Sequence, residues 1–268
     1  MYQYRRFTLE DITPRALILS MINSVGTRQQ SISELVKSAE VFAIEPAAIR
    51  VAASRLVKEG ILESPERGIY ISGGTAKRLT LRLQNWQNAL SKVTDWSGDW
   101  LANATHHLGR TDRKQLRARE RAFSLTGYRE AETGLWVRPA NLVRSLADHR
   151  SDLIALGADD GIITLKISGV SQPAGTDWAD LWDRNNLRTS YQTALSDMQT
   201  SLKRLPDLPP LEGAREALLI GQSVIRCINV DPLLPDEFGD RALFGEMLNT
   251  MKAYNIAGRT CWRKFRQG

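Results

Sequence analysis

The first 75 residues combine three short helical patterns with a hairpin pattern, and this combination restricts the possible folds most strongly. The helical patterns cover residues 13–25, 31–42 and 46–59, and a turn between two short strands follows within residues 61–72. Helices this short are marginal alone, so they must pack on one another and on the hairpin. Helices and a hairpin in this order predict a winged helix-turn-helix domain.

Capping and turn residues mark the ends of these elements. Thr13 can cap the first helix, and Pro14 suits its first turn. Ser31 and Glu34 stand three residues apart at the start of the second helix, where each can satisfy a free backbone N–H of the other. Ser64–Gly68 contains the proline and the glycine that favour a hairpin turn.

The third helical pattern, IRVAASRLVK, carries different chemistry on its two sides. At about 100° per residue, one side is apolar and holds Ile49, Ala52, Ala53 and Leu56. The opposite side is basic or small and holds Arg50, Val51, Ser54, Arg55 and Lys58. The major groove of DNA admits one α-helix, and arginine paired with guanine is the commonest specific contact there. The pattern favours a DNA-recognition helix, although a solvated basic face would have the same composition.

Each outward residue has an expected role in such an interface. Arg50 and Arg55 are the first candidates for contacts with bases or phosphates, and Lys58 is a candidate for phosphate. Val51 and Ser54 are small enough to let the helix approach the groove, and Val51 can touch a thymine methyl.

Three further residues extend the expected interface. Arg67 lies at the hairpin tip, which winged domains commonly set against the minor groove or the backbone. Ser31 and Ser33 begin the second helix, where hydroxyls and free N–H groups can donate to phosphate. Helix capping alone explains these two serines at least as well.

A leucine-rich seam follows the hairpin. Its apolar residues recur at spacings of four and three, and they are Leu79, Leu83, Trp86, Leu90 and Val93, with Thr75 as a plausible cap. The spacing predicts a connecting helix over residues 76–94. Two heptads are too few for a coiled coil alone, so docking on a neighbouring domain is favoured over self-pairing.

Residues 98–169 show the order strand, helix, two strands, helix, strand. The expected strands are Trp100–Thr105, Tyr128–Ala131, Leu135–Arg138 and Ile162–Ile167, and the expected helices cover 112–125 and 141–156. This order predicts a ferredoxin-like α/β sandwich. Three helices are expected after it, from Asp177 to about Leu205, over 212–229 and over 239–256.

The predicted fold class is therefore a multidomain α+β protein. Its expected parts are a winged helix-turn-helix domain (1–75), a connecting helix (76–94), a ferredoxin-like middle domain (95–172) and a helical C-terminal domain (173–268).

Four groups of fragments, in order, resemble segments of the phenylacetic-acid-degradation repressors of the PaaX type. They are IRVAASRLVKEGIL (49–62), WSGDWL with SLTGYREAETGLWVRP (96–101 and 124–139), LWDRNNLRTSY (181–191) and CINVDPLLPDEF (227–238). The resemblance implies a bacterial transcriptional repressor with the three domains described above. It also implies a functional homodimer and release of repression by phenylacetyl-CoA.

The chain departs from the family pattern at two places. Ile61 stands where the family has tryptophan in EGWL, and Phe238-Gly239-Asp240 replaces a Trp-Pro-Gly-like element. These departures leave three alternatives for the effector: another acyl-CoA, another aromatic acid, or no small molecule at all.

Basic residues concentrate in the second quarter of the chain. Residues 76–150 contain 14 Lys and Arg against 7 Asp and Glu, whereas residues 1–75 contain 9 against 8. The expected helix over 112–123 carries Arg113, Lys114, Arg117, Arg119 and Arg121. This basic side is either a solvated surface or a contact for the phosphates of DNA or of an effector.

Trp136 and Arg138 stand two positions apart and hence share one face of a strand. An aromatic wall beside a cation suits an aryl-acyl effector that bears an anion. A packed tryptophan beside a surface arginine is the simpler explanation.

No catalytic or metal-binding spacing is present. His106 and His107 are adjacent and would point to opposite faces of a strand. Asp95 and Asp99 precede the first strand of the middle domain, and a metal-dependent ribonuclease with an accessory winged domain is one alternative. A winged-helix protein-interaction module without a DNA role is another.

The sequence thus predicts a cytoplasmic regulator that is not an enzyme and carries no metal or resident cofactor. No segment is apolar enough to span a membrane, and Cys227 and Cys261 lack metal or redox spacing. The expected partners are a double-stranded DNA operator with an inverted repeat, a second copy of the chain, and a small-molecule effector.

Overall fold

The computed structural model describes residues 3–24, 29–73, 85–171 and 175–267. In this part of the chain the protein is a mixed α+β structure with two small antiparallel sheets. Its residues form two compact units. Unit 1 consists of Met1–Gln3, Asn88–Tyr191 and Val230–Gly245, and unit 2 of Tyr4–Gln87, Gln192–Asn229 and Glu246–Gly268. The division into four consecutive domains stays a prediction, and three boundaries between the units, after Tyr191, Asn229 and Gly245, fall within long helices.

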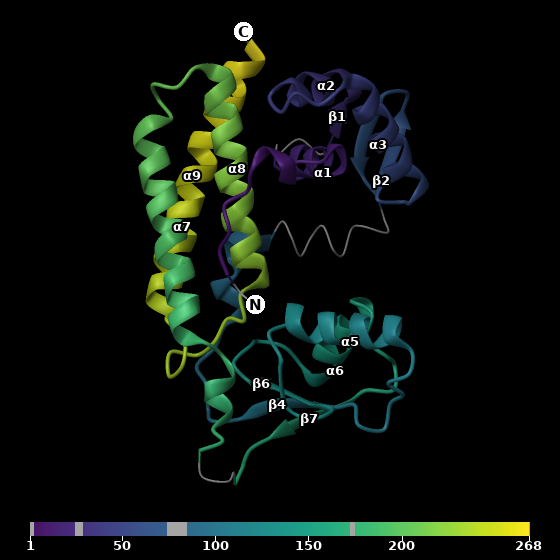
Figure 1. Ribbon diagram of the computed structural model, residues 1–268, viewed down its shortest axis with the longest axis vertical. Coiled ribbons are helices and arrows are strands. Elements are labelled where there is room, and N and C mark those ends of the chain that lie inside the picture. The colour runs from purple at the N-terminus through teal and green to yellow at the C-terminus, as the bar shows by residue number, and fades with distance from the viewer. Residues whose placement is uncertain (1–2, 25–28, 74–84, 172–174, 268) are drawn as a thin grey trace. The chain divides into compact units, whose positions relative to one another are not determined.

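Helices and a three-stranded sheet form the N-terminal part of unit 2 (Figure 1). The elements are η1 (Leu9–Asp11), α1 (Pro14–Ser24), β1 (Gln29–Ser31), α2 (Ile32–Glu40), α3 (Pro46–Lys58), β2 (Leu62–Glu66) and β3 (Ile69–Ser72). The strand order is β1-β3-β2, and both strand pairs are antiparallel. The three helices and two strands expected here are confirmed.

Strand β1 is an addition that the sequence does not predict. Its three residues, Gln-Gln-Ser, are polar, and it pairs with β3 through Gln29–Ile71 and Ser31–Ile69. A strand this short has no alternating pattern, so pairing with a distant segment decides its conformation.

Apolar side chains from α1, α2 and α3 meet in one core. Its fully enclosed members include Leu17, Ile18, Leu35, Ile49, Ala53 and Leu56. Leu218 and Trp262 of the C-terminal helices belong to the same core. The expected caps are present as well, because Thr13 Oγ1 accepts the Ala16 N–H at 3.2 Å.

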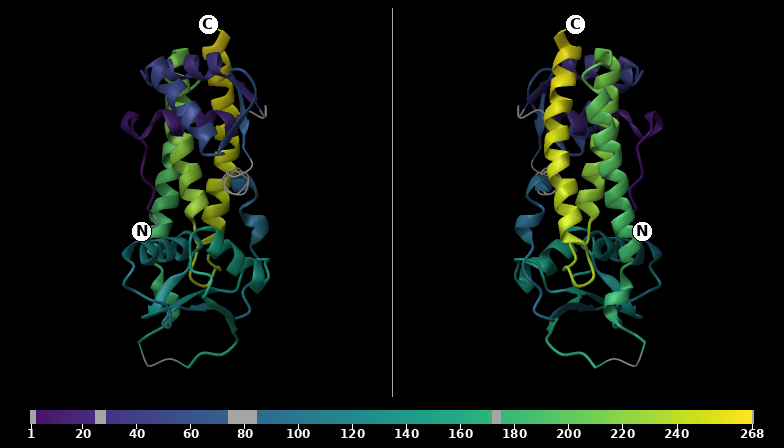
Figure 2. Two further views of the ribbon diagram at one scale, coloured as in Figure 1. Left: turned by 90° about the vertical axis from the view of Figure 1, so that its right-hand side faces the viewer. Right: turned by 90° about the vertical axis from the view of Figure 1, so that its left-hand side faces the viewer.

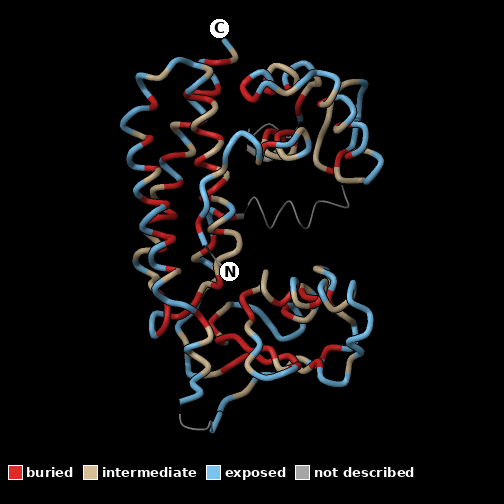
Figure 3. Tube along the Cα trace, in the orientation of Figure 1, coloured by how far each residue is buried: buried red, intermediate tan, exposed pale blue. Residues whose placement is uncertain are grey.

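Three long helices end the chain: α7 (Arg184–Arg204), α8 (Pro210–Val230) and α9 (Arg241–Gln267). Within unit 2 they run side by side in both views of Figure 2, and buried residues alternate with exposed ones along them in Figure 3. Ser201 Oγ of α7 lies 2.6 Å from Glu216 Oε1 of α8 and 2.8 Å from Tyr254 Oη of α9. This polar contact joins all three helices.

The start of α7 differs from the expectation. Asp177 caps only a short 3-10 helix, η4 (Trp178–Leu181). Trp182 then takes an extended conformation, with its ring buried and its indole N–H donated to the Gly127 carbonyl at 3.3 Å. The long helix therefore begins at Arg184, after Trp182 has anchored the chain in unit 1.

The last helix continues beyond the expected end near residue 256, up to Gln267. Gly258 stands within it, where a Cβ atom would lie 3.3 Å from the Ala217 Cβ of α8. The glycine therefore marks a close approach of the two helices and not a helix end.

Unit 1 contains a four-stranded antiparallel sheet of order β5-β6-β4-β7. Its elements are β4 (Trp100–Ala104), α5 (Arg113–Leu125), β5 (Arg129–Glu132), β6 (Leu135–Pro139), α6 (Leu146–Ala155) and β7 (Ile163–Ile167). Helices α5 and α6 cover one face of the sheet (Figure 1), and Leu101, Phe123 and Leu153 are buried between the layers. All four expected strands and both helices are present. Helix α6 begins later than expected, because Ser145 caps it.

An aromatic cluster surrounds Trp100 in unit 1. The rings of Trp96, Trp178, Trp182 and Phe238 lie between 5.4 and 6.1 Å from the Trp100 ring, centroid to centroid. Fragments far apart in the sequence thus meet at one end of β4.

The expected connecting helix over 76–94 lies partly outside the described residues, with Thr75, Leu79 and Leu83 among those not described. Its described part forms two 3-10 helices, η2 (Asn85–Asn88) and η3 (Leu90–Lys92), and not one α-helix. Val93 then pairs with Leu142 in an isolated bridge. In the described part of the chain, no helix combines the length and the apolar character needed to cross a bilayer.

Candidate nucleic-acid interface

Helix α3 has defined ends. Pro46 occupies its first turn, where the missing N–H costs nothing. The helix ends at Lys58, and Gly60 follows with φ of +68°. Glycine adopts this left-handed conformation more easily than other residues. Gly60 therefore favours the end of α3 and the turn that leads into β2.

The two sides of α3 are separated as the sequence predicts. Ile49, Ala53 and Leu56 are wholly buried. The five outward residues are exposed, and they are Arg50, Val51, Ser54, Arg55 and Lys58. Val51 lies in the middle of this face and is 50% exposed, although its side chain is apolar.

The cations of the α3 face have no counter-ions in the part of the chain that the structure describes. Arg50, Arg55 and Lys58 form no ion pair among the described residues. Glu59, the acid next in sequence, pairs instead with Arg15 of α1, with Oε2 and Nη1 2.6 Å apart. The outward face of α3 is therefore positively charged and open.

The two serines at the start of α2 differ in their hydrogen bonds and their exposure. Ser31 Oγ accepts the Glu34 N–H at 3.2 Å and donates to Glu34 Oε2 at 2.8 Å, while Glu34 accepts the Ser31 N–H at 2.8 Å. The last of these bonds is the main cause of a lowered pKa for the Glu34 carboxyl. Ser31 is thus occupied as a cap, whereas the Ser33 side chain is exposed and has its Oγ 3.0 Å from Ser31 Oγ.

The β2–β3 hairpin places Arg67 at its turn. Gly68 follows with φ of +79°, and its carbonyl accepts the Ile32 N–H at 2.8 Å, which ties the turn to the start of α2. Arg67 is exposed, and so are Glu63 and Glu66 on β2. The expected loop covers Ser64–Gly68, but β2 continues through Pro65 to Glu66, so the turn lies at Arg67 and Gly68. The pairing of β2 with β3 is irregular between Glu63 and Glu66.

Trp136 and Arg138 share a face of β6, as expected, and both are buried in unit 1. Trp136 stacks on Phe123 with ring centroids 4.9 Å apart. The Arg138 guanidinium donates to the carbonyls of Thr126, Pro139 and Pro232. The arginine that the sequence leaves at the surface is therefore enclosed, with its donors directed at backbone.

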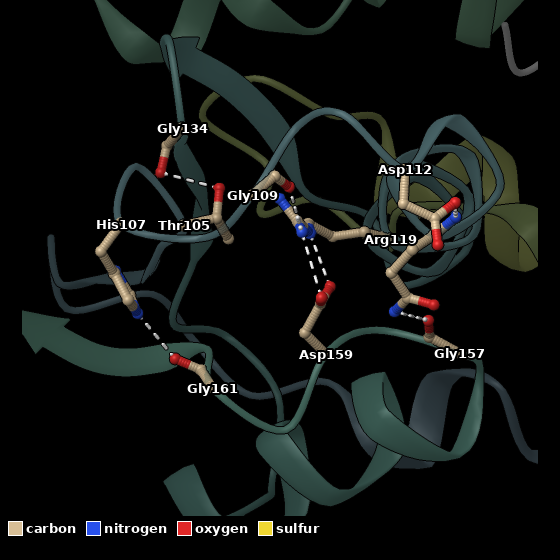
Figure 4. A network of polar contacts seen from close by, with 10 residues as sticks. Thr105, His107, Gly109, Asp112, Arg119, Gly134, Gly157, Asp159 and Gly161 are labelled. Carbon is tan, nitrogen blue, oxygen red and sulfur yellow. Dashed lines mark hydrogen bonds and ion pairs between the residues drawn. The ribbon is translucent and has the colours of Figure 1, made fainter.

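One arginine of α5 is buried, and the other cations of this helix are exposed. Arg119 is buried, and its guanidinium bonds both carboxylate oxygens of Asp159, at 2.6 and 3.1 Å, and the Gly109 carbonyl (Figure 4). Asp112 caps the helix through the Lys114 and Gln115 N–H groups. The exposed cations of α5 are Arg113, Lys114, Arg117 and Arg121. Arg119 is structural, and the remaining four form a basic surface.

The histidines and aspartates considered for metal chemistry have other contacts. His107 Nε2 lies 2.9 Å from the Gly161 carbonyl (Figure 4). Asp99 pairs with Lys166 at 2.7 Å, and Asp95 with Arg241 at 3.2 Å. Among the described residues, no group of three His, Cys, Asp or Glu side chains is placed to hold a metal ion.

One feature of unit 2 has no counterpart in the sequence-based expectations. A cleft of about 440 Å³ is lined by α8, α9 and Met21 of α1, and three arginines of α9 are among its lining residues: Arg259, Arg263 and Arg266. The spacings of four and three place these arginines on one side of a helix. The apolar pattern predicts that the last helix ends near residue 256, so these three arginines are not expected on a common helix.

Comparison with known proteins gives a fold and no function. No protein-family model matches the chain, and no curated protein matches it. The solved structure of an uncharacterized protein, Rv0674 from Mycobacterium tuberculosis, is similar with a TM-score of 0.57 and 22% sequence identity. The similarity covers 94% of this chain and 100% of that chain. The two chains therefore share an α+β architecture over nearly the full length of both.

Proposed function

We propose that this protein is a DNA-binding transcriptional regulator that sets α3 into the major groove of its operator. One observation carries the proposal: α3 presents Arg50, Arg55 and Lys58 on an exposed face, without an ion pair to any described residue, and buries Ile49, Ala53 and Leu56 on its opposite face. A helix with this division supplies the cationic contacts that fix a protein on phosphates and the arginines that read guanine.

The surrounding elements support a winged helix-turn-helix domain. Helices α1, α2 and α3 pack around one core, and the β2–β3 hairpin follows α3 directly. In this proposal Arg67 at the hairpin turn contacts the minor groove or the backbone. The Ser33 hydroxyl contacts phosphate, while Ser31 acts mainly as the helix cap.

The strand order β5-β6-β4-β7, with two helices on one face of the sheet, favours a ferredoxin-like sandwich for unit 1. Together with the resemblance of four groups of fragments to PaaX-type repressors, it favours a dimeric bacterial repressor of a catabolic operon. A twofold dimer sets two α3 helices on successive major-groove faces of an inverted repeat. Such a regulator acts in the cytoplasm and is released by a small-molecule effector.

Selection of duplexes from a random DNA library tests the proposal. We expect enrichment of an inverted repeat, and we expect affinity for it to fall steeply between about 50 and 200 mM salt, because phosphate contacts release counterions. Enrichment of no sequence, with binding that does not respond to salt, would contradict the proposal and favour a protein-interaction module.

A further inference from the structure

The cleft in unit 2 has the size of a small-molecule site. Its volume of about 440 Å³ lies within the range of about 300–1,000 Å³ typical of ligand pockets. Leu218, Gly221 and Ile225 line it from α8, and Tyr254 and Trp262 line it from α9. These residues are mostly apolar and largely buried, so the interior of the cleft suits an apolar ligand body.

One polar group of the lining, the Tyr254 hydroxyl, is already hydrogen-bonded, which leaves the aromatic ring of this residue for a ligand. The Tyr254 hydroxyl lies 2.8 Å from Ser201 Oγ, behind the cleft. Gly221 has no side chain, and a Cβ atom there would lie 3.6 Å from Met251 Cε. The missing side chain at Gly221 therefore leaves room between α8 and α9.

The charged lining residues of the cleft all have the same sign. Arg259, Arg263 and Arg266 contribute to its lining, and neither aspartate nor glutamate does so. Arg259 and Arg263 are exposed and form no ion pair or hydrogen bond among the described residues. An apolar cleft with unopposed guanidinium groups is complementary to an anion on an apolar body.

Arg266 adds an independent indication. Its Nε–H is buried and has no hydrogen-bond acceptor among the described residues, although the guanidinium lies 5.9 Å from the centre of the Trp262 ring. A buried donor without an acceptor is unfavourable, and a ligand oxygen in the cleft would satisfy it.

We propose that this cleft binds an amphipathic anion, with an aromatic or otherwise apolar body between α8 and α9 and one anionic head group at the arginines of α9. Met21 of α1 lines the same cleft and belongs to the core shared by α1 and α3. An occupied cleft therefore biases the position of α1, and with it α3. This regulatory consequence, unlike the site itself, rests on the proposed function, and it requires different ligand affinities in the two arrangements.

The test uses two fluorescent probes that differ in charge. 8-Anilinonaphthalene-1-sulfonate carries the anion, and N-phenyl-1-naphthylamine has the same rings without it. We expect the sulfonate to bind the folded full-length protein with one site per chain. The double variant Arg259→Ala/Arg263→Ala should weaken sulfonate binding at least tenfold and change binding of the neutral probe less than twofold.

Two further variants control the experiment. Lys264→Ala removes one positive charge from an exposed position of α9 that does not line the cleft, and it should leave both probes unaffected. Gly221→Leu fills the cleft and should weaken both. Circular dichroism and thermal unfolding establish that each variant is folded.

Equal sulfonate affinity in the double variant and in Lys264→Ala would overturn the site. So would equal losses for both probes in the double variant. DNA affinity is measured separately on the same proteins. Charge-dependent probe binding without sequence-specific DNA binding would leave the site standing and remove the proposed function, and the reverse outcome would remove the site alone.

Discussion

Arg15 of α1 and Glu59, the residue after α3, form an ion pair with Nη1 and Oε2 2.6 Å apart. The pair occupies Glu59, the acid next to Lys58 in sequence, and Arg50, Arg55 and Lys58 form no ion pair with a described carboxylate. Both side chains are about half exposed, and pairs of this kind contribute only about 0–1 kcal/mol to stability. The pair therefore matters more for the local charge beside α3 than for the fold.

Glu59→Gln tests this relationship. The substitution removes one negative charge beside α3 and frees Arg15, so we expect DNA affinity to rise about two- to threefold at low salt. The free energy of unfolding should change by less than about 1 kcal/mol. Fluorescence anisotropy with a labelled duplex measures the first quantity and urea titration the second. Weaker DNA binding in this variant would show that Glu59 orders the interface and does not merely add charge.

Truncation of a side chain should cost much more stability on the buried face of α3 than on its exposed face. Leu56 is wholly buried, and Leu56→Ala leaves a cavity that costs about 2–5 kcal/mol. Val51 is half exposed on the same helix, so Val51→Ala should change the free energy of unfolding by less than about 0.5 kcal/mol. Urea denaturation of both variants measures the difference. Equal effects would mean that the helix is rotated from its described orientation.

Burial of His149 should make stability depend on pH. Its side chain is 5% exposed, and burial, aided by Arg138 and Arg144, lowers its pKa from 6.5 to about 4. The unfolded chain therefore takes up the proton first as the pH falls. The contribution of His149 is fully present above about pH 6.5 and is lost toward pH 4, by about 3 kcal/mol in all.

His149→Gln isolates this contribution, because glutamine does not titrate. Asp231 is also buried, which raises its pKa to about 6, and a raised acid pKa stabilises the folded state as the pH falls. The difference between the parent and variant curves removes this opposing contribution. Parallel curves of unfolding free energy between pH 7 and 4.5 would contradict the assignment.

Arg119 and Arg117 provide a matched pair on α5. Arg119 is 3% exposed and bonds Asp159 through two donors, so Arg119→Ala should cost about 3–5 kcal/mol by leaving a partly buried carboxylate unpaired. Arg117 is exposed, and Arg117→Ala should lie within about 0.5 kcal/mol of the parent. Thermal unfolding compares them, and similar melting temperatures would show that the Asp159 contact is not maintained in solution.

Local sequence signals account for the elements that were predicted correctly. The Ser31 and Glu34 box, Pro46 and Gly60 each act within a few residues of chain, so their consequences can be read without the tertiary structure. The alternation of buried and exposed residues in α3 follows from its period in the same way. The basic outward face of this helix was accordingly predictable residue by residue.

Features that depend on distant residues were not predictable. Strand β1 exists because β3 pairs with it, and the burial of Arg119 depends on Asp159. Asp177 has the chemistry of a helix cap, yet the anchoring of Trp182 in unit 1 delays the long helix. The cleft is lined by Met21 together with residues of α8 and α9. A short sequence pattern does not predict contacts between segments so far apart in the chain.

The most direct test of the central claim is the affinity of Arg55→Ala for the operator selected from random duplexes. Lys264→Ala, which removes a positive charge far from α3 in sequence, serves as the matched control, and circular dichroism confirms folding of both proteins. The account predicts that Arg55→Ala reduces specific binding to the level of non-specific DNA, while Lys264→Ala keeps the affinity of the parent. Specific affinity of Arg55→Ala within twofold of the parent would contradict the assignment of α3 as the recognition helix.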